Sequence, residues 1–463
     1  MSNVTGKVGN YRWTIVALLL FSTTINYMDR NVIGYLKDYF CSEEGFAWTS
    51  QQFSYLTSAF TLFYAVFTLL AGWIIDKIGT KMGLALSLIT WSLAGILSAF
   101  MGKGLGAHIA ARSLFGMGEA GNFPASNKTI AEWFPKKERA LAVGVFNSGS
   151  NIGAMICALF VPWCLLMWTS DTKFLGIFHG WQMAFIVTGV LGFIWLIFWG
   201  ISYMSPKMAL EKGLVKQPEY DYIHSDNTAE ENAVEASGEE VVGKENKISW
   251  FKMLTYRQTW SFVVGKFLTD GVWWFLLFWL PTYVKQQFCV GMSVEDTAHY
   301  VMLSTFIVFG VAIFGSVYGG SIPMTFINKG WETYKARMTA MLLIAVAPVL
   351  LLLTQWAAGT WGIVAAIAII CVAGAAHQAW SANLFTTVSD MFPKKSVGTV
   401  TGIGAAAGGL GGVLVQLLAG YLDGNFETNT AYGIMFSVCA FAYLLAWVIM
   451  KWLVPKYTPI TDL

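Results

Sequence analysis

The tetrapeptide Phe134-Pro-Lys-Lys137 occurs a second time in this chain, as Phe392-Pro-Lys-Lys395. Each copy follows an apolar stretch and has an acidic residue two positions before its phenylalanine. Each copy also leads into a glycine-rich apolar stretch, at residues 144–153 and 402–412. A repeat this far apart in an apolar chain indicates two halves of the same construction. That arrangement is typical of transporters, whose site lies between the halves.

The composition is that of an integral membrane protein. Of the 463 residues, 56% are hydrophobic and 12% are charged, and the mean hydropathy is +0.56, whereas a soluble domain carries about 25% charge. The six cysteines have no zinc or C-x-x-C spacing, so no metal site is expected. Enzyme and nucleotide-binding motifs such as a P-loop are absent from the sequence, so we expect neither an enzyme nor a cofactor.

Apolar runs of about 20 residues predict twelve membrane-spanning helices. We expect an all-α integral membrane protein with an N-terminal six-helix bundle (1–204), a cytoplasmic linker (205–258) and a C-terminal six-helix bundle (259–463). The core of the linker, residues 225–246, is polar and is predicted to be flexible. The predicted helices are 12–36, 51–75, 81–101, 106–132, 139–166, 180–203, 259–287, 297–321, 336–355, 361–391, 398–422 and 430–453.

Basic residues concentrate in alternate loops, which fixes the expected orientation. They are frequent in the loops near Lys77, Lys136, Arg337 and Lys394 and sparse in the opposite set. By the positive-inside rule, both termini and the linker are expected to be cytoplasmic. Cys41 and Cys289 belong to the opposite loops, where free thiols and a disulfide remain alternatives.

The segment Gly72-Trp-Ile-Ile-Asp76-Lys77-Ile-Gly79-Thr-Lys81 matches the G-x-x-x-D-[RK]-x-G-x-[RK] signature of the major facilitator superfamily. Gly79 permits a tight turn, and Asp76 can pair with cationic groups at the cytoplasmic face. We interpret the segment as a gating motif; the alternative is a basic loop that only obeys the membrane topology.

Predicted helix 12–36 contains Asp29 and Arg30, and predicted helix 106–132 contains Arg112 and Glu119. A charge at mid-membrane costs ~2.5–3.5 kcal/mol even on the lenient insertion scale, so such residues indicate function. Protonation of one carboxylate would leave the four groups with a net positive charge suited to an organic anion. Arg30 is the expected carboxylate contact, because its planar fork binds carboxylates bidentately. The alternative is an ion-pair network that only joins two helices.

The repeat also aligns the two halves residue by residue. Glu119 and His377 each precede the phenylalanine of their copy by 15 positions. His377, Gln378 and Asn383 would therefore offer hydrogen bonds where the N-terminal half offers charge, an arrangement that suits a sugar acid. A histidine that only packs within the membrane is the alternative.

Asp270-Gly271 interrupts an apolar run and predicts a locally broken helix, a feature that often lines a binding cavity. Trp273 and Trp274, which follow, are candidates for stacking on a sugar face or for anchoring at the interface. Three further cavity candidates, for which core packing is the alternative, are Tyr64, Asn147 and Ser150.

The block Arg112-Ser-Leu-Phe-Gly-Met-Gly-Glu-Ala-Gly-Asn-Phe-Pro124, with Glu132-Trp-Phe-Pro-Lys-Lys-Glu-Arg-Ala140 and Phe146-Asn-Ser-Gly-Ser-Asn-Ile-Gly153, closely resembles the anion:cation symporter family. The nearest branch resembles the bacterial hexuronate transporters. Support comes from Asn26-Tyr-Met-Asp-Arg30, Phe267-Leu-Thr-Asp270, Trp273-Trp274, Trp279-Leu-Pro281 and Ala376-His-Gln-Ala379.

This resemblance implies alternating access and proton-coupled uptake of galacturonate or glucuronate across the bacterial cytoplasmic (inner) membrane. By position, it implies a proton-titrating pair, Asp29 and Glu119, with Arg112 as the partner of Glu119. It implies substrate contacts from Arg30, Tyr27 and Tyr64. The related galactonate carriers have larger polar side chains at the positions of Ser150, Ala405 and Gly409.

We therefore expect a monomer in the lipid bilayer that binds a small organic anion and H⁺, with no nucleic acid as partner. The alternatives are a transporter or exchanger of another organic anion (an aldonate, dicarboxylate, aromatic acid or sugar phosphate) and a transporter-like sensor.

Overall fold

The computed structural model of the chain describes residues 8–169, 172–225, 250–392, 394–456 and 460. In this part the chain is helical, apart from loops and an isolated bridge between Phe174 and Phe178. The N-terminal half contains α1 (Tyr11–Cys41), α2 (Ser50–Ile78), α3 (Thr80–Ser98), α4 (Leu105–Glu119), α5 (Asn122–Trp133), α6 (Lys136–Met167) and α7 (Gly180–Ser202).

The linker contributes short helices, and the C-terminal half repeats the pattern of the first. The linker helices are α8 (Pro206–Glu211), α9 (Gln217–Ile223) and α11 (Trp250–Met253). The C-terminal half contains α12 (Arg257–Phe288), α13 (Val294–Gly319), α14 (Ser321–Asn328), α15 (Thr333–Val346), the 3₁₀ helix η1 (Ala347–Leu353), α16 (Thr354–Trp361), α17 (Ile363–Met391), α18 (Lys394–Asn425) and α19 (Thr428–Leu453). The predicted flexible core of the linker lies mostly outside the described residues.

Ten helical spans within the described residues are long and apolar enough to cross a membrane. The remaining two predicted spans are α1 and the α4–α5 pair. α1 carries Asp29 and Arg30, and the span with Arg112 and Glu119 is divided into α4 of 15 residues and α5 of 12 residues, each too short to cross a membrane alone. The all-α prediction with two six-helix bundles is confirmed.

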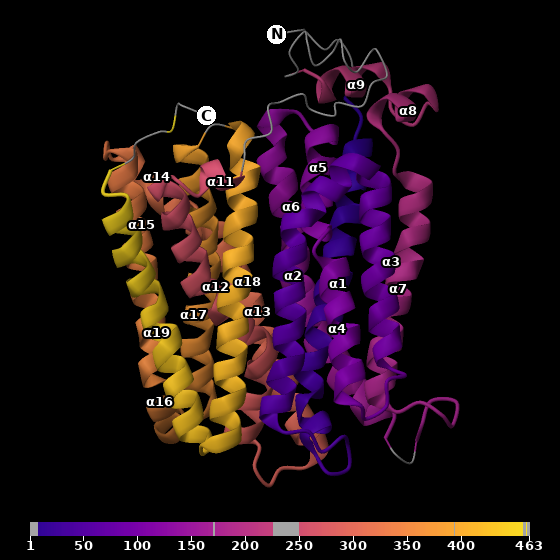
Figure 1. The fold of residues 1–463 in the computed structure, drawn as a ribbon, viewed down its shortest axis with the longest axis vertical. Helices are drawn as coiled ribbons and strands as arrows, with labels where there is room; N and C mark the ends of the chain where they lie inside the picture. The colour runs from indigo at the N-terminus through magenta and orange to yellow at the C-terminus, as the bar shows by residue number, and fades with distance from the viewer. Residues whose placement is uncertain (1–7, 170–171, 226–249, 393, 457–459, 461–463) are drawn as a thin grey trace.

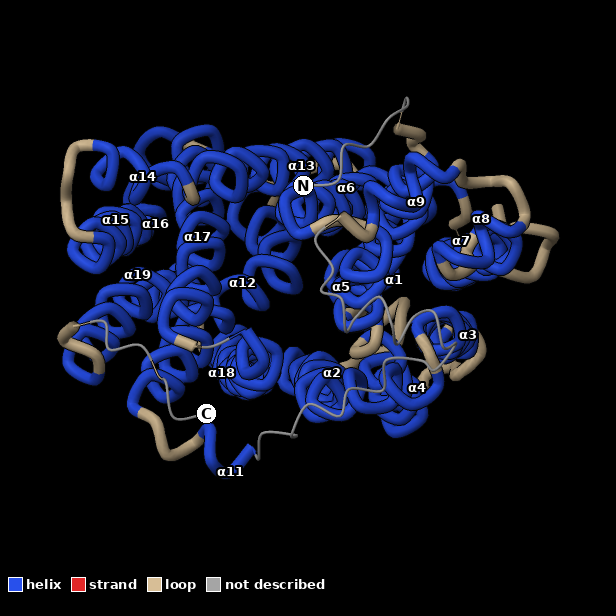
Figure 2. Tube along the Cα trace, turned by 90° about the horizontal axis from the view of Figure 1, so that it is seen from above, coloured by secondary structure: helices blue, strands red, loops and turns tan. Residues whose placement is uncertain are grey.

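The two bundles stand side by side, with the ends of α1 and α19 that lie nearest the termini at the same end as α8 and α9 (Figure 1). Seen from that end, α2 lies beside α18, and α6 lies beside α13, while α1 faces α12 across the centre (Figure 2). We call this boundary between the halves the seam, and the end that carries α8 and α9 the linker side.

Glycines in the duplicated stretches allow equivalent close packing in each half. A Cβ added at Gly153 of α6 would lie 2.3 Å from the carbonyl oxygen of Thr24 on α1. A Cβ added at Gly411 of α18 would lie 1.9 Å from the carbonyl oxygen of Phe267 on α12. Each glycine-rich helix therefore lies against the first helix of its own half at a distance that other residues do not permit.

The acidic residue before each tetrapeptide is hydrogen-bonded within its own half. Glu132 accepts hydrogen bonds from Thr80 Oγ1 at 2.6 Å and from the Tyr203 hydroxyl at 2.5 Å. Asp390 forms an ion pair with Arg337. The side chains of the lysines in both copies lie outside the described part of the structure.

The segment predicted to be a gating motif joins α2 to α3. Gly79 is the single residue between them and has a positive φ of 80°, which explains the glycine. Lys81 Nζ donates to the carbonyl oxygen of Gly200 at 2.9 Å, and the Lys77 ammonium lies 3.9 Å from the ring centroid of Trp73. Gly72 is half-buried, and the side chain of Asp76 lies outside the described residues.

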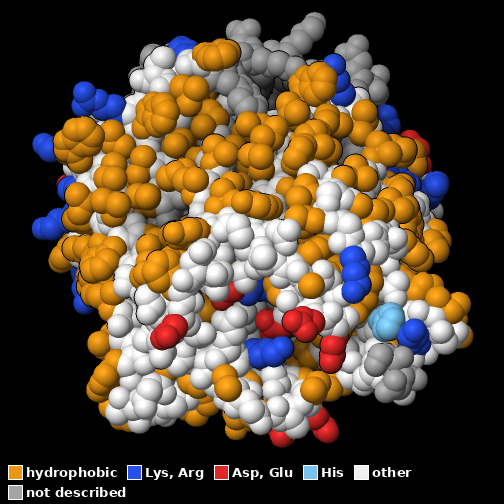
Figure 3. All heavy atoms as spheres, turned by 60° about the horizontal axis from the view of Figure 1, so that its bottom comes forward, with side chains coloured by type: hydrophobic (Ala, Val, Ile, Leu, Met, Phe, Trp, Pro, Cys, Tyr) orange, Lys and Arg blue, Asp and Glu red, His pale blue; other side chains and the backbone are white. Residues whose placement is uncertain are grey.

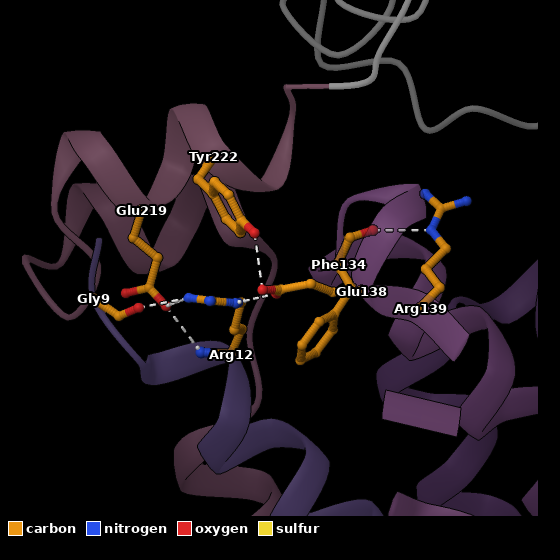
Figure 4. A network of polar contacts seen from close by, with 7 residues as sticks. All are labelled: Gly9, Arg12, Phe134, Glu138, Arg139, Glu219 and Tyr222. Atoms are coloured by element: carbon orange, nitrogen blue, oxygen red, sulfur yellow. Dashed lines mark hydrogen bonds and ion pairs between the residues drawn. The ribbon is translucent and has the colours of Figure 1, made fainter. Parts of the chain in front are cut away.

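The linker helix α9 is attached to the N-terminal half by Arg12 (Figure 4). The guanidinium of Arg12 lies 3.0 Å from Glu138 of α6 and 3.3 Å from Glu219 of α9. The Tyr222 hydroxyl donates to Glu138 at 2.8 Å. One buried cation thus holds α1, α6 and the linker together.

Two expectations are settled by the structure. The predicted break at Asp270-Gly271 is wrong, because α12 is one continuous helix through both residues. A Cβ added at Gly271 would lie 2.6 Å from Val415 of α18, so this glycine serves close packing instead of breaking the helix. Cys41 and Cys289 are both free thiols.

The close approach of α18 to α12 gives a stability prediction. Gly411→Ala should destabilise the protein by about 1–3 kcal/mol, because the new methyl group overlaps a backbone carbonyl that has no room to move. Gly402→Ala on the same helix is the matched control, since nothing lies within 4 Å of its added Cβ. Thermal unfolding of both variants in detergent tests this. Equal melting temperatures would show that the two helices are not in close contact there.

Candidate functional site

Arg30 and Glu119 form a dry ion pair in the interior of the N-terminal half. Arg30 Nε of α1 donates to Glu119 Oε2 of α4 at 2.8 Å, and the two side chains are 2% and 0% exposed. A terminal nitrogen of the same guanidinium donates to Asn26 Oδ1 at 3.3 Å. The pair joins two helices, so its state of charge is coupled to how those helices pack.

Aromatic rings from both halves surround the Arg30 guanidinium. Its central carbon lies 4.4 Å from the ring centroid of Tyr27, 4.8 Å from that of Tyr64 and 5.3 Å from that of Trp274. Trp274 belongs to α12, so the cation sits at the seam. Cation–π contacts of this kind contribute about 2 kcal/mol when desolvated.

Asp29 and Arg112 lie behind this pair, inside the N-terminal bundle. A Cβ added at Gly95 of α3 would lie 3.8 Å from Asp29 Oδ1, and Arg112 lies 5.0 Å from the ring of Phe185 on α7. The predicted quartet therefore divides into a pair at the seam and two charged residues one layer deeper.

Several of these charged atoms are buried without a hydrogen-bond partner in the described part of the chain. They are Asp29 Oδ2, Glu119 Oε1, and Arg112 Nε and one of its terminal nitrogens. Buried polar atoms are nearly always satisfied, and here protons, water or a ligand are the available partners. These atoms leave hydrogen-bonding capacity unused in the interior of the N-terminal bundle.

The C-terminal half contains a second polar group of side chains. The Lys266 ammonium lies 2.6 Å from Asp270 Oδ2, one turn away on α12. His377 of α17 stacks on Trp273 with ring centroids 5.1 Å apart, and its Nδ1 lies 2.8 Å from the Tyr443 hydroxyl. Trp273 thus faces into its own bundle, whereas its neighbour Trp274 faces Arg30.

The remaining predicted residues lie farther from these contacts. Asn147 and Ser150 are half-buried on α6, where Ser150 Oγ donates to the carbonyl oxygen of Asn147 at 2.8 Å. Gln378 is half-buried beside His377. Asn383 is buried against α13 and donates to the carbonyl oxygen of Gly319 at 2.8 Å, so the structure does not bring it to the Arg30 cluster.

Buried charges close the seam on the side opposite the linker. Lys37 of α1 lies 2.7 Å from Asp423 of α18, with the two side chains 2% and 5% exposed. Ser50 of α2 donates to the same carboxylate at 2.5 Å, and Lys37 lies 4.6 Å from the ring centroid of Trp279. Charged side chains gather near the middle of this end, while apolar side chains cover the flank above it (Figure 3).

A buried amide extends this contact toward Arg30. Gln416 of α18 accepts from Thr57 at 3.2 Å and from the Trp279 indole at 2.6 Å, and it donates to the carbonyl oxygen of Trp274 at 3.0 Å. Between described residues, the hydrogen bonds and ion pairs that cross the seam lie on this side of the Arg30 level.

Three residues that form buried ion pairs, Lys266, Lys37 and Asp423, were missed by the sequence reasoning. Lys266 stands four positions before Asp270 in an apolar run, and that spacing alone could have paired them. Lys37 and Asp423 are 386 positions apart, and no local signal connects them.

Two pseudo-symmetric helical bundles that meet around buried charges define a secondary membrane transporter. The comparisons with known proteins support this class. The sequence model of the Major Facilitator Superfamily matches residues 19–415. The chain belongs to this superfamily, and the protein is a transporter and not an enzyme.

The similar proteins include sugar acid transporters. The hexuronate transporter of Escherichia coli (strain K12) is 28% identical over 445 residues, covering 96% of this chain and 95% of that protein. The galacturonate transporter of Dickeya chrysanthemi is 31% identical over 322 residues, covering 69% and 84%. The fold resembles the inward open conformation of the xylose transporter XylE from E. coli, with a TM-score of 0.68, 16% identity and 97% of each chain covered.

The ion pair between Arg30 and Glu119 gives a second stability prediction. In a double-mutant cycle with Arg30→Met and Glu119→Gln, we expect a coupling free energy of about 0.5–3 kcal/mol, because each single change leaves a buried group without its partner. Thermal unfolding in detergent measures it.

The exposed ion pair of Lys285 and Asp38 is the matched control, with side chains 47% and 26% exposed. Its coupling should not exceed about 1 kcal/mol. A coupling free energy at Arg30 and Glu119 no larger than that of the control would contradict a dry pair.

Proposed function

We propose that the protein imports a hexuronate, galacturonate or glucuronate, together with H⁺ by alternating access. The observation that carries the proposal is the buried Arg30–Glu119 pair, which is enclosed by aromatic rings from both halves. The names of the sugar acid transporters to which the chain is similar support this substrate class.

Protonation of Glu119 is the proposed coupling step. A proton on Oε2 removes the countercharge of Arg30 and leaves its guanidinium free to bind a carboxylate through two parallel N–H···O bonds. The bound proton and anion together leave the net charge of the site unchanged. Loss of the proton restores the Arg30–Glu119 bond and displaces the anion.

Asp29 and Arg112 extend the proton path behind this pair. Both interact electrostatically with Glu119. A proton on Asp29 would free Arg112 to compensate the charge of Glu119. The protonation state of Asp29 therefore controls how strongly Glu119 binds Arg30. Both carboxylates are therefore assigned to proton coupling.

The rings around Arg30 would hold the sugar. Tyr27, Tyr64 and Trp274 offer apolar faces for the C–H groups of a pyranose, and tyrosine hydroxyls and indole N–H groups bind its oxygens. From the other half, His377 and Gln378 are proposed to contact hydroxyl groups, with Asn147 and Ser150 at the flank. The predicted hydrogen bond from Asn383 to the substrate remains a prediction.

We infer that the linker side is cytoplasmic, because the basic loops lie there. The contacts around Lys37 and Gln416 would then close the outer side of the seam, as expected of a state that faces the cytoplasm. The halves 1–204 and 259–463 are proposed to rock about the seam with residues 205–258 between them, and the gating motif at Gly72–Lys81 is proposed to close the cytoplasmic side in the opposite state.

Transport by purified protein tests the function. In proteoliposomes with an inwardly directed H⁺ gradient, wild type should accumulate labelled galacturonate. Glu119→Gln should abolish accumulation but retain exchange of internal for external galacturonate, because it mimics the protonated carboxyl. A Na⁺ gradient at equal pH is the control for the coupling ion.

Accumulation driven by Na⁺ alone would contradict proton coupling. Absence of galacturonate uptake under either gradient would contradict the hexuronate assignment, and a screen of aldonates, dicarboxylates, aromatic acids and sugar phosphates would follow. Binding without transport of any of these acids would favour a sensor.

The proposed outer closure gives a further prediction. Asp423→Asn leaves Lys37 buried without a countercharge, which costs about 3–5 kcal/mol in the closed state and should open the outer side. Nitroxide labels at Glu44 and Met292, with Cys41 and Cys289 replaced by serine, would report this as a shift to longer distances in pulsed EPR.

Asp38→Asn is the control, because it breaks only the exposed pair with Lys285. Its distance distribution should stay close to that of the parent. An unchanged distribution in Asp423→Asn would show that a buried Lys37 without its countercharge does not disfavour the closed state.

A further inference from the structure

Lys266 and Asp270 form a second intramembrane ion pair, which the proposed coupling step does not use. Their side chains are 9% and 17% exposed, compared with 2% and 0% for Arg30 and Glu119. The pair is shielded, yet it is more accessible than the one in the N-terminal half. The Lys266–Asp270 pair therefore keeps a small accessible surface that the Arg30–Glu119 pair lacks.

The packing of α18 leaves room for the Asp270 carboxylate. A Cβ added at Gly408 would lie 2.2 Å from Asp270 Oδ2, so a larger residue at this position would displace the carboxylate. A Cβ added at Gly409, the next residue of α18, would lie 2.4 Å from Ala65 of α2, so this turn of α18 lies at the seam. The carboxylate is therefore held beside the part of α18 that contacts the N-terminal half.

The neighbours of Lys266 are suited to polar recognition. Its ammonium lies 4.9 Å from the ring centroid of Phe385 and interacts electrostatically with His377. An ammonium donates hydrogen bonds and a carboxylate accepts them, so the pair can satisfy two hydroxyl groups at once. The net charge of the Lys266–Asp270 pair is zero.

The two ion pairs differ in what they connect. Arg30 and Glu119 come from separate helices, so breaking their bond changes how α1 and α4 pack. Lys266 and Asp270 are one turn apart on one helix, and their bond can rearrange without moving a helix. The second pair therefore suits substrate recognition better than conformational coupling.

We propose that Asp270 sets the charge specificity of the site through its pair with Lys266. The neutral pair binds hydroxyl groups at the uncharged end of a hexuronate. It rejects an aldarate, whose second carboxylate would meet Asp270 at short range in a site with little water to screen the repulsion. This inference rests on the proposed function, because it requires Arg30 to hold the first carboxylate.

Uptake of labelled galacturonate and labelled galactarate into proteoliposomes tests the inference. Wild type should prefer galacturonate. Asp270→Asn leaves the Lys266 charge uncompensated, and we expect the galactarate-to-galacturonate uptake ratio to rise at least about tenfold, which is the effect of 1.4 kcal/mol. Lys266→Met should weaken galacturonate uptake without raising this ratio, because Asp270 remains to repel the second carboxylate.

Asp296→Asn, on the exposed first turn of α13, is the matched control and should leave the ratio unchanged. Should Asp270→Asn not accumulate in the membrane, thermal stabilisation of Asp270→Ser by each acid in detergent gives the same comparison. Galactarate should then stabilise the variant more than it stabilises wild type.

An unchanged ratio in an Asp270 variant that still takes up galacturonate would overturn the inference and leave the proposed function standing. Equal uptake of both acids by wild type would also overturn it. A wild type that takes up neither acid would overturn the proposed function, and this inference with it.

Discussion

A guanidinium inside a membrane-spanning helix needs a partner, and the N-terminal half is arranged around the partner of Arg30. Glu119 reaches it from the break between α4 and α5, where close packing against α2 and α3 brings the carboxylate inward. Aromatic rings complete the enclosure, one of them from the other half. Because bilayer lipids cannot solvate these groups, loss of either partner would leave the other buried and uncompensated, so the pair ties α1 to α4.

The halves share a backbone plan but use it for different chemistry. In the N-terminal half, charged residues lie on several helices, and the ion pair of Arg30 and Glu119 joins α1 to α4. In the C-terminal half, Lys266 and Asp270 lie on one helix, and His377 is fixed by Trp273 and Tyr443. Pseudo-symmetry therefore supplies a scaffold in which ionic contacts between helices on one side face fixed polar side chains on the other, and the proposed sugar acid would bind between them.

Much of the fold and of the candidate site could be predicted from the sequence, and the rest could not, for physical reasons. The repeated tetrapeptide predicted the two halves, and intramembrane charge marked Arg30 and Glu119, because both signals are local. The predicted break at Asp270-Gly271 was wrong because packing against α18 overrode a local preference. The depth of Arg112 depends on helix rotation, and the pairing of Lys37 with Asp423 depends on tertiary structure, so neither was accessible from a single sequence.

The buried charges at the seam explain how a small ligand can shift so large an assembly. An apolar seam would favour the closed state strongly, because separation exposes its surface to water. Lys37 and Asp423 lose their partner on separation but regain hydration, so their contribution to closing is close to balanced. A ligand shifts a conformational equilibrium only by its difference in affinity between the states. A nearly balanced seam would therefore let the modest free energy of the proposed proton and anion at Arg30 decide which side is open.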